Sequence, residues 1–122
     1  MNVWAWLGVA LLGGIGAGAR LAVVSAVSSR TGGNRPLGVL VVNVSGSLLL
    51  GLLVGLAVRG SLLVLAGAAT LGSYTTFSTW MLETQRLGED GRRWAATANV
   101  LVSLLLGIAA IVLGRKIGAQ LA

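Results

Sequence analysis

Apolar residues dominate four long stretches of the chain, and short polar segments separate them. The stretches run over residues 3–27, 37–58, 61–82 and 94–113. Each is close to the roughly 20 residues that a helix needs to cross about 30 Å of hydrocarbon. The pattern therefore predicts an all-α integral membrane four-helix bundle, with residues 1–122 as a single transmembrane domain.

The connecting segments are too short to hold a separate catalytic domain, so we expect the protein to work within the bilayer. The first stretch has no basic segment before it and stays apolar for over twenty residues. It is therefore interpreted as a retained span and not as a cleaved signal. The distribution of basic residues between the two sides of the membrane gives only a weak preference for both termini lying outside. It is also compatible with insertion in either orientation.

Composition strengthens the membrane interpretation. The chain is 56% hydrophobic and 10% charged, whereas soluble domains carry about 25% charged residues. It has no cysteine and no histidine, which excludes disulfides, thiolate chemistry and the commonest metal ligands. The net charge of +6 comes from scattered basic residues, a distribution typical of membrane loops and not of a nucleic-acid surface.

Small residues are frequent in the apolar stretches, which include most of the 19 glycines. Gly14 and Gly18 form one GxxxG pair, and Gly51 and Gly55 form another. In lipid such pairs let helix backbones approach closely. Ordinary tight packing explains any one pair, but together they predict a compact assembly that forms a homo- or hetero-oligomer.

Acidic residues are absent from the depth of the predicted spans. All three, Glu83, Glu89 and Asp90, lie at or beyond the end of the third stretch. Cation-coupled transporters usually bind their coupling ion on an intramembrane carboxylate. The pattern leaves passive conduction, anion handling or a structural role, and it leaves an enzyme without a nucleophile, base or metal ligand.

Two polar side chains within the spans need an account. Arg20 could extend to the far membrane interface, or its charge could face a vestibule and attract anions. Asn43 could clamp two helices by hydrogen bonds, or its amide could donate to an anion that is losing its water.

The strongest local signal is LGSYTTFSTW, residues 71–80. Six of these ten positions bear hydroxyl groups: Ser73, Tyr74, Thr75, Thr76, Ser78 and Thr79. So dense a run directly after a glycine predicts a break in the third transmembrane helix. Freed carbonyls could hold a small cation, and the following half-helix could present N–H groups to an anion. Phe77 and Trp80 are either a lipid-facing pair or aromatic edges that contact a small anion.

Three segments together resemble the Fluc (CrcB) fluoride channel family: GGIGAGAR, GVLVVNVSGSLLLG and GSYTTFSTW. They occur in the family's order, and the resemblance extends over nearly the whole chain. The resemblance implies an antiparallel dimer with two pores through which fluoride leaves the cytoplasm passively. It places the protein in the bacterial plasma membrane as a multi-pass protein.

The resemblance also implies roles for particular residues. A structural sodium ion at the dimer interface would be held by the backbone carbonyls of Gly72 and Thr75. The fluoride pathway would include Arg20, Asn43, Phe77, Ser78, Thr79, Trp80 and Ser103.

Three positions depart from the family pattern. Trp80 replaces a second phenylalanine, Val39 replaces a threonine, and Asn99 replaces a tyrosine. In the family each pore takes its two phenylalanines from different subunits, so a homodimer would carry the change in both pores. The expected partner in the antiparallel dimer is therefore the chain itself or a paralogous subunit, and the hypothesis suggested by these changes is a heterodimer.

Two other functions are compatible with the size of the chain. A small four-helix multidrug exporter would need an acidic residue in the first span, and this chain has none there. A non-conducting structural membrane subunit would explain the glycines but not the hydroxyl cluster with Asn43.

Overall fold

Every regular element is a helix in the computed structural model, which describes all 122 residues. The long helices are α1 (Val3–Arg30), α2 (Arg35–Gly55) and α6 (Arg93–Leu121). The segment between α2 and α6 comprises four shorter pieces: α3 (Gly60–Leu63), the π-helix η1 (Val64–Leu71), α4 (Gly72–Tyr74) and α5 (Ser78–Glu89). This confirms the all-α prediction.

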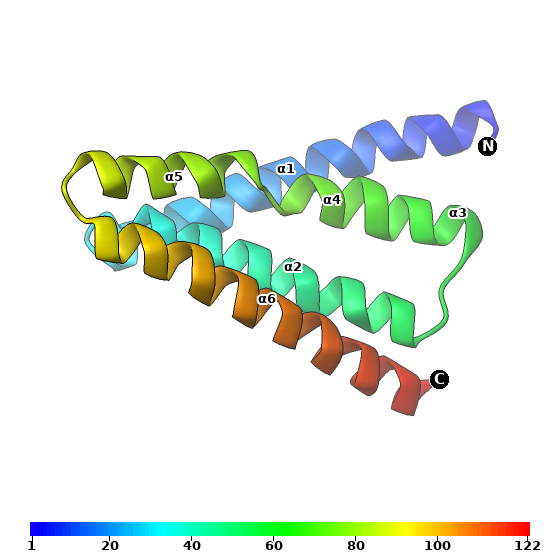
Figure 1. Cartoon of the computed structure of the whole chain (residues 1–122). Coiled ribbons are helices and arrows are strands. Elements are labelled where there is room, and N and C mark those ends of the chain that lie inside the picture. Colours follow the sequence, from blue (N-terminus) through cyan, green and yellow to red (C-terminus); the bar gives the residue numbers. More distant parts are fainter.

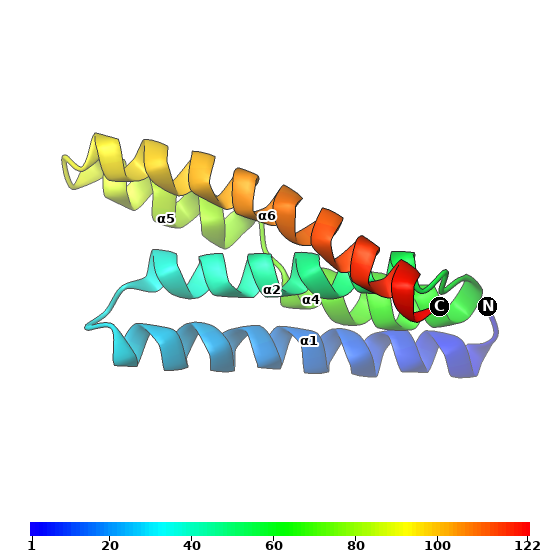
Figure 2. The ribbon, with the colours of Figure 1, turned by 90° about the horizontal axis from the view of Figure 1, so that it is seen from below.

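The helices lie lengthwise beside one another, and both termini are at the same end of the molecule (Figures 1 and 2). The α1–α2 and α5–α6 connections lie at the opposite end. Three helices, α1, α2 and α6, are long and apolar enough to cross a membrane. Large apolar side chains on α1 and α6 are widely exposed, such as Leu11 (69%) and Leu105 (67%), as expected for surfaces that face lipid. The chain is therefore a multi-pass membrane protein.

Asparagines fix the start of the first two helices. Asn2 accepts a hydrogen bond from the Ala5 amide at 2.9 Å, and Asn34 accepts one from the Leu37 amide at 3.1 Å. These side chains satisfy amides that have no partner in the first turn. The connection before α2 turns sharply at Gly32 and Gly33, with φ of +68° and +94°, a conformation open mainly to glycine.

Glycines bring α2 and α6 into backbone contact. A Cβ atom on Gly51, Gly55, Gly114 or Gly118 would run into a carbonyl oxygen of the other helix; the carbonyls belong to Ile111, Arg115, Leu48 and Leu52, in that order. The GxxxG pair of α2 is therefore used within the chain. The pair on α1 is not, because a Cβ on Gly14 or Gly18 would meet nothing within 4 Å.

This difference predicts opposite outcomes for two identical substitutions. Gly114→Ala should lower the free energy of unfolding by about 1–3 kcal/mol, because the added methyl group overpacks a backbone contact. The matched change Gly14→Ala should be neutral or stabilising, since alanine favours a helix by about 1 kcal/mol. Thermal unfolding of the two purified variants in detergent tests this. Equal melting temperatures would contradict the intrachain role of Gly114.

The third apolar stretch bends in its middle. Thr75–Phe77 lie outside any helix, between α4 and α5, and Thr75 is extended with φ −77° and ψ 160°. The helix then resumes and continues to Glu89, beyond the expected boundary at residue 82. The last helix likewise extends past residue 113, to Leu121.

Candidate functional site

Asn43 holds the bend from the neighbouring helix α2. Its Nδ2 donates to the Thr76 carbonyl at 2.8 Å, and its Oδ1 accepts from the Thr76 amide at 2.8 Å. The side-chain amide therefore satisfies both backbone polar groups of a residue that has left the helix, as burial in lipid requires. Of the two roles open from the sequence, the structure shows the clamp, and one Nδ2 hydrogen remains for another acceptor.

The surrounding hydroxyls complete the local structure of the bend. The Thr75 hydroxyl donates to the Leu71 carbonyl at 3.0 Å, which closes the end of α4. The Thr76 hydroxyl accepts from the Thr79 amide at 3.2 Å and so caps the start of α5. Gly46 of α2 leaves room for the bend, because a Cβ there would collide with the methyl group of Thr75.

Several backbone groups at the bend have no partner in the chain. The carbonyl oxygens of Gly72 and Thr75 accept no hydrogen bond, and the amides of Phe77 and Trp80 donate none. Free carbonyls at a break in a helix are typical cation ligands, and the exposed amides of a half-helix attract anions. No cluster of acidic, histidine or cysteine side chains competes as a metal site. The residues present therefore fit a carbonyl-bound sodium ion.

Phe77 and Trp80 form an aromatic pair at the start of α5. Their ring centroids are 5.7 Å apart and their planes cross at 82°, an edge-to-face arrangement. Phe77 is 69% exposed. Trp80 is partly buried against a cluster of three valines: Val24, Val39 and Val42.

These residues border an open groove of about 860 Å³ between α2 and the bent segment. Five residues predicted from the sequence lie along it: Asn43, Gly72, Thr75, Phe77 and Trp80. Ser78 and Thr79 follow in the first turn of α5. Arg20 borders neither this groove nor the cavity described next. Its side chain makes no hydrogen bond or ion pair within the chain.

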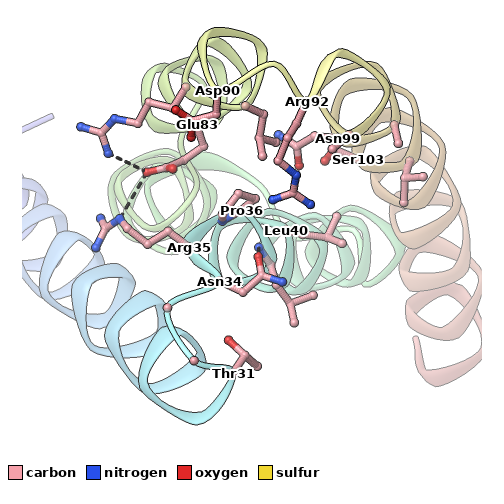
Figure 3. Close-up of a pocket in the computed structure, with 18 residues that line it drawn as sticks. Thr31, Asn34, Arg35, Pro36, Leu40, Glu83, Asp90, Arg92, Asn99 and Ser103 are labelled. Carbon is pink, nitrogen blue, oxygen red and sulfur yellow. Dashed lines mark hydrogen bonds and ion pairs between the residues drawn. The ribbon is translucent and has the colours of Figure 1, made fainter.

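A second cavity, of about 650 Å³, lies at the end of the molecule where the α1–α2 and α5–α6 connections meet (Figure 3). It contains Ser103, which the sequence assigned to the same pathway as Phe77. The Ser103 Oγ is buried and has no hydrogen-bond partner. Beside it, the side-chain amide of Asn99 donates from Nδ2 to the Thr84 hydroxyl at 2.9 Å. The structure thus places Ser103 and Phe77 at different hollows of the chain.

Glu83 is a site residue that the sequence did not single out. Its side chain is only 6% exposed and accepts from Arg35 Nε at 3.2 Å and from Arg86 Nη1 at 3.3 Å. Figure 3 shows both contacts at the wall of the second cavity. The Arg86 contact follows from the i,i+3 spacing on a helix, but Arg35 is 48 residues away in the chain. Arg92 and Asp90 also border this cavity, so its wall carries three arginines and two carboxylates, and Glu83 pairs with two of the arginines.

Comparison with known proteins agrees with the predicted resemblance. The profile of the CrcB-like protein family, described as camphor resistance (CrcB), matches residues 7–115. A protein of Mycolicibacterium paratuberculosis named fluoride-specific ion channel FluC 2 is 55% identical over 120 residues, which are 98% of either chain. The FluC 2 protein of Mycobacterium tuberculosis is 50% identical over 117 residues, 96% of this chain and 93% of its own.

Symbiobacterium thermophilum has two such relatives. Its FluC 1 protein is 46% identical, with 94% of this chain and 96% of its own covered, and its FluC 2 protein is 39% identical, with 90% and 94% covered. No solved structure matches significantly. The relatives are named as ion channels, in agreement with the prediction that the chain is not an enzyme. On the family profile and these identities, the chain belongs to the CrcB family.

Proposed function

We propose that this chain is a subunit of a fluoride channel and that fluoride passes beside the bend at Thr75–Phe77. The observation that carries the proposal is the way Asn43 holds the bend while the Phe77 ring remains exposed. The names of the relatives supply the ion: each is called a fluoride-specific ion channel.

The chemistry of the bend suits this ion. Fluoride is small and holds its water tightly, so a pore must offer replacement contacts. The free amides of Phe77 and Trp80 and the spare Nδ2 hydrogen of Asn43 are donors, and the edge of an aromatic ring carries positive partial charge. A passive channel also needs no carboxylate for ion coupling, and Glu83 is already bound to two arginines.

The second cavity is the proposed mouth of the pathway. Its wall carries Arg35, Arg86 and Arg92 against Glu83 and Asp90, three positive charges against two negative ones, and such a positive excess raises the local concentration of anions. Ser103 offers a buried hydroxyl with no other partner. Fluoride would leave the cytoplasm down its gradient, because hydrogen fluoride enters cells uncharged and dissociates inside.

The free carbonyls of Gly72 and Thr75 support a structural role for sodium. A bound sodium ion would neutralise their negative ends and hold the bend in place. These residues border the open groove, and we propose that a second subunit packs there in antiparallel orientation. Under this proposal the bend is the broken third transmembrane helix of the family, and the host membrane is the bacterial plasma membrane.

The partner we propose is a paralogous subunit. The three departures from the family pattern lie together in the structure, since Trp80 packs on the cluster that contains Val39 and donates to the carbonyl of Asn99. The packing of Trp80 on this cluster supports a coordinated change at positions 39 and 80 in one subunit of a pair, whereas Asn99 contributes only a backbone carbonyl, which any residue would offer. The two relatives of Symbiobacterium thermophilum show that one organism can carry two such chains.

Fluoride efflux from liposomes tests the proposal. The chain co-reconstituted with a paralogue from its own organism should release fluoride at least about tenfold faster than the chain alone, and neither sample should release chloride. Equal rates with and without the paralogue would refute the heterodimer. Absence of fluoride efflux from both samples would refute channel function.

A further inference from the structure

We propose that Trp80 is a positioning residue that holds the ring of Phe77, and that it does so by anchoring α5 to the backbone of α6. The proposal depends on the proposed function in one respect: Phe77 must border the path of fluoride. It assigns to Trp80 a different task from that of a second ring contacting the ion.

The polar end of Trp80 contacts α6. Its Nε1 donates to the Asn99 carbonyl on α6 at 3.3 Å. An indole has a single N–H donor and no acceptor, so this bond uses its whole hydrogen-bonding capacity. The indole N–H of Trp80 is therefore already bound to protein and is not free to bind an anion.

The apolar part of Trp80 has two contacts. Part of it packs against the cluster of Val24, Val39 and Val42, of which Val42 is fully buried. The indole also meets the Phe77 ring edge-to-face at 5.7 Å. Because Phe77 itself is 69% exposed, Trp80 supplies the aromatic contact that orients its ring.

The acceptor of this anchor is a backbone group. Asn99 uses its carbonyl for Trp80 and its side-chain amide for Thr84. These two bonds can therefore be separated by mutation. Asn99→Ala removes the bond to Thr84 but keeps the carbonyl that holds Trp80, so it is a matched control for the anchor.

The sequence provides a probe of the ring itself. Phe77 is the only phenylalanine, so uniform labelling with 4-fluorophenylalanine places a single fluorine at position 77. The ¹⁹F NMR spectrum of the purified full-length protein then reports on this one ring. It needs no transport, which separates failure of this inference from failure of channel function.

Two changes at position 80 test the anchor. β-(3-Benzothienyl)alanine, introduced through an amber codon, keeps the two-ring shape and lacks the N–H donor. Trp80→Leu removes the ring as well. We expect the Phe77 resonance to broaden or split with the analogue, to shift further with leucine, and to stay unchanged in Asn99→Ala. Fluoride efflux with the analogue should fall about 3- to 10-fold, the effect of one hydrogen bond.

The benzothienyl analogue is the decisive variant, because it removes the N–H donor and preserves the shape of the side chain. If it leaves both the resonance and the efflux rate as in the native protein, the N–H anchor has no positioning role. If Asn99→Ala disturbs the Phe77 resonance as much as the analogue does, the carbonyl is not the group that matters. Either result overturns the proposal.

Discussion

Phe77→Ile should lower fluoride efflux from liposomes about 30- to 150-fold in the conducting assembly. The ring is exposed at the start of α5, beside unpartnered amides. Isoleucine keeps much of the apolar volume but has no positively polarised edge. A desolvated cation over a ring face gains about 2 kcal/mol or more, and we expect a comparable gain for an anion at the positively polarised ring edge. A barrier raised by about 2–3 kcal/mol gives the stated loss.

Trp4→Ile is the matched control. Trp4 is also a highly exposed aromatic residue, at 79%, but it borders neither the groove nor the second cavity. Efflux should stay within about twofold of the native rate, since a change of under 0.5 kcal/mol is typical for such surface positions. Native efflux in Phe77→Ile would remove that ring from the pathway. An equal loss in both variants would point to a general effect on the membrane assembly.

Asn43→Leu should also abolish efflux, because the bend loses both of its ties to α2. The Thr76 amide and carbonyl would then be left without partners, and a buried unsatisfied polar group costs about 1–3 kcal/mol. We expect the variant to be less stable by about 2–6 kcal/mol, the sum for the two groups. Thermal unfolding in detergent and fluoride efflux together measure this.

Asn43→Asp tests the hydrogen bonds of residue 43 separately from the size of its side chain. The carboxylate can still accept from the Thr76 amide, but when ionised it places an oxygen against the Thr76 carbonyl instead of a donor. Efflux should therefore be lost although the side chain has the same size. Ser45→Ala is the control on the same helix, since Ser45 bonds only to the Val42 carbonyl and to the Tyr74 hydroxyl. An active Asn43→Asp channel would show that the donor half of the clamp is dispensable.

Much of the architecture could be predicted without coordinates. The lengths of the apolar stretches indicated the membrane helices, and the structure has three helices that meet this requirement together with a bent fourth segment. The dense hydroxyls of residues 71–80 marked the position where the helix bends. Asn43 was identified as a polar residue in need of a partner, although its partner, the backbone N–H and C=O of Thr76, could not be named.

Other features depend on residues that are distant in the chain. The importance of Glu83 was not recognised, because hydropathy placed it at the end of a span. The structure instead buries it against Arg35 at the start of α2. Ser103 and Phe77 were assigned to one pathway, yet within the chain they border separate hollows. The GxxxG pairs of α1 and α2 look alike in the sequence, but Gly51 and Gly55 meet another helix, whereas Gly14 and Gly18 meet nothing within 4 Å.

The sequence alone determined that this is a helical membrane protein with a polar interruption in its third apolar stretch. This is so because the cost of placing each residue in lipid is largely a property of that residue and of its neighbours along the helix. Only the tertiary structure decided which groups satisfy one another: Asn43 with Thr76, Glu83 with two arginines, and Trp80 with the Asn99 carbonyl. Hydrogen bonds and edge-to-face contacts act over a few ångströms. They therefore depend on how the helices pack, which the apolar pattern does not specify.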